Sequence, residues 1–61
     1  MKAVDYGNVK ERLQKAVEET CGRETNYRMG KLVGMVTVYL ELGIISKDEG
    51  KELLVYFLDL A

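Results

Sequence analysis

Hydrophobic residues recur at helical spacing in the N-terminal third of the chain. They fall at i, i+4, i+7 and i+8, positions that share one face of a helix. These residues are Val9, Leu13, Ala16 and Val17. Cys21 extends the same stripe, and we expect its side chain to be partly buried and unreactive. The pattern predicts an amphipathic first helix.

Cap signals place this helix at about 5–21. Asn8 with Glu11 forms a capping-box pattern, and Asp5 offers an alternative start with a hydrophobic staple. Gly22 supplies the residue type that most often ends a helix in the left-handed conformation. We therefore expect a short loop between the first helix and the next hydrophobic segment.

The second segment, about 26–42, is apolar around most of its circumference. Thr25 or Asn26 is expected to cap this helix, and Gly43 is expected to end it. Because a helix that is apolar on nearly all sides is buried on nearly all sides, we expect extensive coverage. The face assigned to the core holds Met29, Leu32, Val33, Val36 and Leu40.

A narrow strip of small and polar residues interrupts this segment. It consists of Gly30, Gly34, Thr37 and Glu41, and its two glycines have GxxxG spacing. A glycine inside a helix costs about 1 kcal/mol relative to alanine, so the strip needs a compensating contact. Close approach of another helix is the physical candidate, and that helix could belong to the same chain or to another one.

A strand is the competing interpretation of residues 35–42. Val36, Val38, Leu40 and Leu42 alternate there with other residues at a spacing of two. We favour the helix, because the segment is long, has cap signals at both ends and lacks an obvious partner strand elsewhere in the sequence.

The third segment, about 46–60, carries the clearest local signal. Ser46 and Glu49 form a capping box, and acidic residues suit the positive end of the helix dipole. The hydrophobic face of this helix includes Gly50, Leu53 and Phe57, and the Gly43-Ile44-Ile45 sequence forms a tight turn before it. The sequence thus predicts one all-α domain of three helices, with the second and third forming a hairpin.

The small size of the chain limits how much hydrophobic surface it can bury. The chain has 61 residues, one Cys and no His, which leaves neither an intramolecular disulfide nor a single-chain zinc site to supplement the core. The second and third helices carry more apolar residues than three helices can cover. We therefore expect a homodimer, or a protein partner, that covers this surface. The interface candidates are Tyr27, Gly30, Gly34, Thr37, Val38, Tyr39, Val55, Tyr56 and Leu60.

Charge supports a second, weaker hypothesis. The net charge is −1, but the basic residues gather in the N-terminal half. A small nucleic-acid-binding regulator is the alternative function, although acidic residues are interspersed among the basic ones and the start of the third helix is acidic. The nucleic-acid candidates are Lys10, Arg12, Lys15, Arg23, Arg28 and Lys31.

Few residues suit catalysis. The chain has no His as a general base, Ser46 is assigned to a helix cap, and Cys21 is placed at a helix C-terminus, where the dipole disfavours a thiolate. We expect no enzyme activity, no cofactor, no metal and no membrane segment, and a soluble, cytoplasmic protein. Our principal hypothesis is a small regulatory protein, an inhibitor or adaptor, that binds another protein through an apolar helical surface, and we expect a bacterial or bacteriophage accessory protein.

Overall fold

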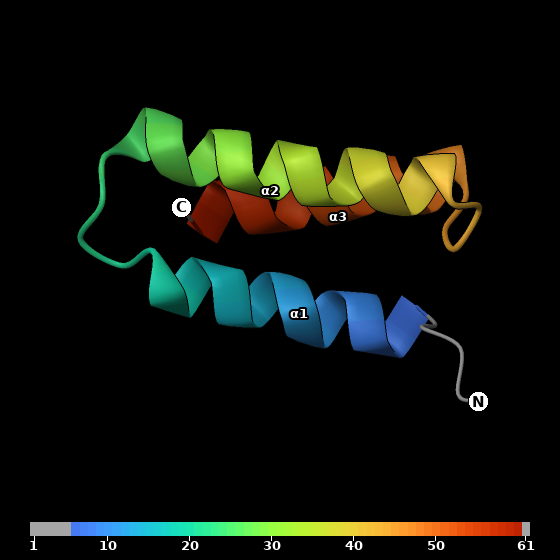
Figure 1. Ribbon diagram of the computed structural model, residues 1–61, viewed down its shortest axis with the longest axis horizontal. Coiled ribbons are helices and arrows are strands. Elements are labelled where there is room, and N and C mark those ends of the chain that lie inside the picture. The colour runs from blue at the N-terminus through green and yellow to red at the C-terminus, as the bar shows by residue number, and fades with distance from the viewer. Residues whose placement is uncertain (1–5, 61) are drawn as a thin grey trace.

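A computed structural model describes residues 6–60 of the chain. This part contains the helices α1 (Tyr6–Glu19), α2 (Thr25–Glu41) and α3 (Lys47–Leu60), and no strand. Successive helices run in opposite directions, and α2 and α3 pack most closely (Figure 1). The all-α prediction is confirmed, and the strand alternative for residues 35–42 is wrong. A continuous helix bonds its own backbone groups in this segment, so no partner strand is needed.

The core lies where one stripe of each helix meets the other two. Leu13, Leu32 and Leu53 are each almost fully buried and bring the three helices together at the centre. A fully buried leucine contributes roughly 1.5–3 kcal/mol relative to an exposed one. The rest of the buried hydrophobic cluster consists of Val9, Ala16, Val17, Val36, Ile45 and Phe57.

The start of α1 differs from the capping-box prediction. The helix already includes Tyr6, so Asn8 lies within the first turn and is not the N-cap residue. The alternative start at Asp5 lies outside the described residues. At the other end, Gly22 has φ +87°, the left-handed conformation expected of a residue that follows a helix.

Thr20, rather than Cys21, continues the buried stripe of α1. The Thr20 side chain is buried, and its Oγ1 donates a hydrogen bond of 2.7 Å to the carbonyl oxygen of Ala16. Cys21 is exposed, which contradicts the prediction that it is partly buried. The helix ends at Glu19, so position 21 no longer follows the helical rotation on which that prediction depended.

Arg28 ties the start of α2 to the end of α1. Its Nη2 donates to the carbonyl oxygen of Val17 at 3.1 Å, and its Nε donates to Oγ1 of Thr20 at 3.3 Å. The guanidinium thereby satisfies a terminal carbonyl and places a positive charge at the negative end of the α1 dipole. The prediction of a Thr25 or Asn26 cap is wrong, because Glu24 is the N-cap residue and makes no side-chain cap bond.

The connection between α2 and α3 combines two standard helix ends. The Gly43 amide donates to the Leu40 carbonyl and the Ile44 amide to the Tyr39 carbonyl, both at 3.0 Å, which is the Schellman pattern. Gly43 has φ +73°, as that pattern requires of its C′ residue. Ile45 is buried beneath the turn and fixes its position against the core.

The predicted capping box at the start of α3 is confirmed. The Ser46 amide donates to Oε1 of Glu49 at 2.8 Å, and the Glu49 amide donates to Oγ of Ser46 at 3.1 Å. One turn later, a Cβ added at Gly50 would lie 3.3 Å from side-chain carbons of both Leu40 and Val36. Gly50 therefore permits the close approach of α3 to α2.

Candidate functional site

The exposed hydrophobic side chains are distributed unevenly over the described helices. Two belong to α3, and the others belong to α2 or its C-cap residue. In chain order they are Tyr27, Met29, Val33, Val38, Leu42, Val55 and Tyr56. The prediction that Met29 and Val33 belong to the buried face is therefore wrong. Two neighbouring helices cover only a narrow stripe of α2, centred on Leu32 and Val36, and these two side chains lie beyond its edge.

The glycine strip of α2 faces away from the bundle. Gly30 and Gly34 each lie two residues from buried Leu32, which at about 100° per residue turns them about 160° away from it. A Cβ added at either glycine would have nothing within 4 Å. The interpretation that the strip packs against a helix of the same chain is therefore wrong. Contact with another chain stays a prediction.

We define the α2 outer face as the side of α2 that is centred on these glycines. Val38 on this face is 51% exposed, and Leu42 at its C-terminal end is 67% exposed. The residues of the α2 outer face are Tyr27, Gly30, Lys31, Gly34, Thr37, Val38, Glu41 and Leu42. Only two of them are charged, so this side of the helix is mainly apolar or small although it faces solvent.

An open groove of about 330 Å³ runs along one edge of the α2 outer face. Gly30 and Gly34 form its floor, and the side chains around them are Lys31, Met35, Val38 and Tyr39. Tyr39 is half-buried and packs against the core, so it contributes the inner wall of the groove and is covered in part by the chain itself. Because Gly30 and Gly34 lack side chains and larger side chains lie beside them, each glycine leaves a shallow notch in the surface of the helix.

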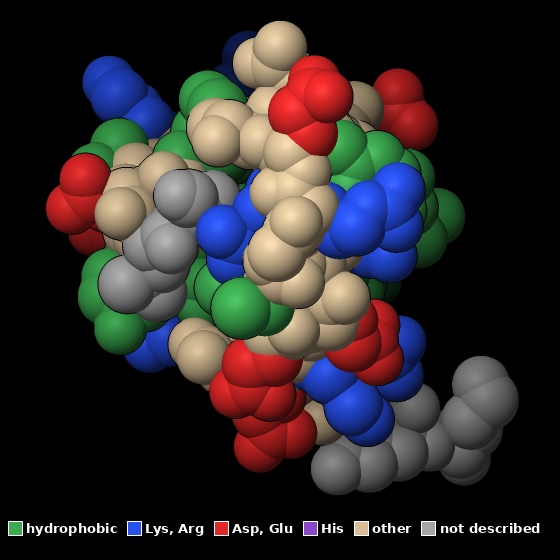
Figure 2. All heavy atoms as spheres, turned by 90° about the vertical axis from the view of Figure 1, so that its left-hand side faces the viewer, with side chains coloured by type: hydrophobic (Ala, Val, Ile, Leu, Met, Phe, Trp, Pro, Cys, Tyr) green, Lys and Arg blue, Asp and Glu red, His purple; other side chains and the backbone are tan. Residues whose placement is uncertain are grey.

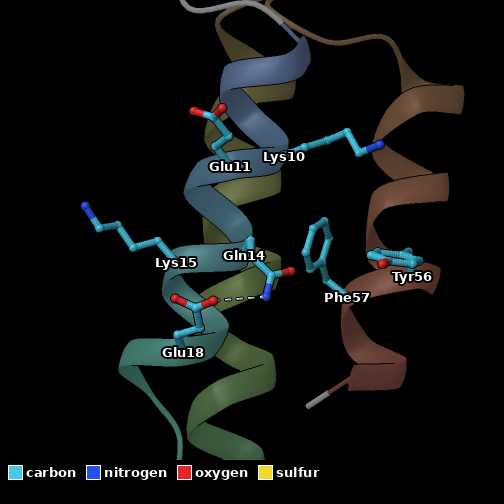
Figure 3. A pocket seen from close by; sticks show the side chains of 7 residues that line it. All are labelled: Lys10, Glu11, Gln14, Lys15, Glu18, Tyr56 and Phe57. Carbon is cyan, nitrogen blue, oxygen red and sulfur yellow. Dashed lines mark hydrogen bonds between the residues drawn. The ribbon is translucent and has the colours of Figure 1, made fainter.

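A second groove, of about 500 Å³, lies between α1 and α3 (Figure 3). Phe57 is buried between the two helices, and the Tyr56 ring meets it edge-on at a centroid distance of 4.9 Å. Lys10 extends toward α3, whereas Lys15 points away from it (Figure 3). The side chains that line the groove are Lys10, Glu11, Gln14, Lys15, Glu18, Tyr56 and Phe57.

The chemistry of the α1–α3 groove is that of a solvated polar rim over an aromatic floor. Gln14 Nε2 donates to Oε2 of Glu18 at 3.3 Å along the exposed side of α1. Sites for small molecules usually enclose most of the ligand surface within apolar walls, whereas this groove has charged side chains on one side and is open. It offers an accessible aromatic edge at Tyr56.

The exposed face of α3 differs from that of α2. Val55 is 68% exposed and lies beside Tyr56, but Lys51, Glu52 and Asp59 surround these two residues. A small apolar group of this kind within a charged surface is ordinary in soluble proteins. The predicted interface residues therefore do not form one surface: those of α2 lie together, and Val55 and Tyr56 lie on another helix. The side chain of Leu60, the last interface candidate, lies outside the described part of the chain.

The basic residues proposed for nucleic-acid binding do not share a surface either. Lys10 and Lys15 are five residues apart on α1, which turns them about 140° from one another. Arg12 lies on the opposite side of the helix from Lys10, whereas Arg12 and Lys15 are three residues apart and lie about 60° from one another. The positive charges of α1 therefore point in two directions, and Glu11 and Glu18 lie on the same helix.

The remaining basic candidates lie toward the other end of α1 or on α2. The Arg28 guanidinium is bound to the end of α1, and the Arg23 guanidinium lies over the Tyr27 ring, 4.2 Å from its centroid. Lys31 belongs to the α2 outer face. Basic and acidic side chains are interspersed over the end of the bundle where α1 leads into α2 (Figure 2). A contiguous basic surface is the electrostatic mark of nucleic-acid binding, and this end does not present one.

Residues 6–60 contain no group of three or more His, Cys, Asp or Glu side chains that could hold a metal ion. In the same range, no buried side-chain nitrogen or oxygen lacks a hydrogen-bond partner. None of the three helices has both the length and the apolar character required to cross a membrane. Comparison with families of known proteins, with curated proteins and with solved structures finds no match to this chain.

Sequence reasoning identified the α2 strip but missed two features around it. Leu42 lay within the predicted helix but was not an interface candidate, whereas in the structure it is the C-cap residue of α2 and is exposed. The structural use of Arg28 had no local signal, because its acceptors at Val17 and Thr20 lie on the preceding helix.

Proposed function

We propose that this chain is a non-enzymatic interaction protein that binds another polypeptide through the α2 outer face. The observation that supports this most strongly is the notched side of α2, on which exposed apolar side chains flank two glycines and which faces away from the core. Burying apolar surface at about 25 cal/mol per Å² is the main driving force of most protein association. Exposed side chains such as Val38 and Leu42 supply that surface.

The two outward glycines add a second reason. Each costs about 1 kcal/mol of helix stability, and no contact within the described chain offsets this cost. A partner that fills the notches would offset it, since absent side chains allow two backbones to approach closely. Binding would account for two glycines that packing within the described residues does not explain.

The shape of the surface favours a helix as the bound element. The α2 helix has 17 residues, and at about 1.5 Å per residue it presents a straight face about 25 Å long. Helices bind such faces through apolar side chains at spacings of three and four residues. A small molecule would leave most of a face this long uncovered.

Affinity capture with two matched variants tests the proposal. Val38→Glu and Val55→Glu each place one carboxylate at an exposed valine, the first on the α2 outer face and the second on α3. Both variants should retain helical circular dichroism, because neither valine is buried. We expect a partner protein from the native host to bind the wild type and Val55→Glu but not Val38→Glu. A partner that is captured equally well by all three would contradict the proposal.

A further inference from the structure

We propose that the α2 outer face binds the same face of a second copy of this chain, with the two α2 helices antiparallel. This inference rests on the proposed function and names the occupant of its binding surface. Two properties of the face carry it, the register of side chains and notches and the register of its charges, and the extent of the face sets the expected strength of the dimer.

Two exposed side chains, Val38 and Leu42, and the two notches of α2 are placed symmetrically about Val36. Gly34 lies two residues before Val36 and Val38 lies two residues after it, while Gly30 and Leu42 lie six residues before and after. In an antiparallel pair whose two-fold axis is level with Val36, Val38 of each copy is level with Gly34 of the other. Leu42 of each copy is likewise level with Gly30. Val38 and Leu42 therefore each lie level with a position where an added Cβ meets nothing within 4 Å.

The two charged residues of the face obey the same symmetry. Lys31 lies five residues before Val36 and Glu41 lies five residues after it. The antiparallel pairing brings Lys31 of each copy level with Glu41 of the other, so the dimer contains two pairs of opposite charges. A parallel pairing in the same register would bring like charges level, Lys31 with Lys31 and Glu41 with Glu41. The net charge of −1 adds little repulsion between copies.

The extent of the face predicts a weak dimer. A stable interface usually buries about 800 Å² on each partner. One side of a helix about 25 Å long and about 10 Å wide supplies less than this. We therefore expect reversible association at roughly tens of micromolar and above.

Sedimentation equilibrium of the whole chain, with a thiol reductant present because Cys21 is exposed, tests the pairing. We expect the wild type to pass from monomer to dimer as its concentration rises, whereas Val38→Glu stays monomeric. Val55→Glu, the matched control on α3, should behave as the wild type does.

Charge reversal tests the antiparallel register. Lys31→Glu and Glu41→Lys each replace two attractive pairs by two repulsive ones, which should weaken dimerisation roughly ten-fold. The double variant Lys31→Glu/Glu41→Lys restores opposite charges and should restore the wild-type Kd. In a parallel dimer the single reversals would change little, because like charges would face each other before and after the change.

The inference is overturned if the wild type is monomeric at several hundred micromolar, or if the double variant dimerises no better than the single ones. Either result leaves the proposed function open to the capture experiment, in which a different protein could still bind the α2 outer face. Conversely, a charge-dependent dimer without a captured partner supports the inference and shows that the bound polypeptide is a second copy.

Discussion

Replacing Gly34 by alanine should stabilise the monomer. Gly34 lies in the middle of α2, its φ is not positive, and an added Cβ has nothing within 4 Å. The change therefore gains the helix propensity of alanine, about 1 kcal/mol, without a steric cost. For a domain of this size, such a gain corresponds to a rise in Tm of roughly 4–8 °C. Thermal unfolding followed by circular dichroism, at concentrations of a few micromolar where the monomer dominates, measures it.

Gly50→Ala provides the matched comparison. Here the new Cβ would lie 3.3 Å from carbons of Leu40 and Val36, which is closer than comfortable van der Waals contact. Overpacking in a core typically costs 1–3 kcal/mol, which cancels or exceeds the gain in propensity of about 1 kcal/mol. We therefore expect Gly50→Ala to be between neutral and about 2 kcal/mol less stable than the wild type, and always less stable than Gly34→Ala.

The same Gly34→Ala variant should respond in the opposite direction at high concentration. The added methyl group occupies the notch that lies level with Val38 of a second copy, so self-association should weaken while monomer stability rises. A loss of Tm at low concentration would refute this reasoning, since it would mean that Gly34 is already in close contact within the monomer. A gain in Tm with unchanged association would refute only the role of the notch in pairing.

Three further predictions concern the helix ends and the basic residues of α1. Arg28→Met keeps the length of the side chain but removes the donor to the Val17 carbonyl, and should cost about 1–2 kcal/mol in urea unfolding; an unchanged free energy of unfolding would show that the bond contributes nothing. Ser46→Ala removes the acceptor of the Glu49 amide and should cost about 1 kcal/mol, measured in the same way, and a neutral result would contradict the importance of the box. Lys15→Glu should leave fluorescence anisotropy with labelled duplex DNA unchanged at low salt, because Lys15 is not part of a basic surface; binding by the wild type that is lost in the variant would revive the nucleic-acid alternative.

The helices were predictable because their signals are local. Ser46 and Glu49 are three residues apart and form their bonds as the sequence pattern indicates. Gly22 and Gly43 both adopt positive φ where a stop was expected. Hydrophobic spacing and caps act within one or two turns, so neither depends on how the helices later pack.

The errors concern features that depend on tertiary packing. The width of the covered stripe on α2 is set by the positions of α1 and α3, and so Met29 and Val33 could not be assigned from periodicity alone. The burial of position 21 depended on a helix that continues to residue 21, whereas α1 ends at Glu19. The sequence gives no sign that Arg28 is anything but an exposed charged residue, because its acceptors on α1 come close to it only when α1 and α2 pack antiparallel.

The most direct test of the account is residue-resolved NMR of the wild-type chain over a range of concentrations. Amide chemical shifts should be followed from tens to several hundreds of micromolar, which spans the dissociation range of a weak dimer. The account predicts progressive shifts at Gly30, Gly34 and Val38, and constant shifts at Lys51 and Val55 on the charged face of α3. Constant shifts along α2, or changes centred on α3 instead, would contradict the claim that the α2 outer face binds a second copy.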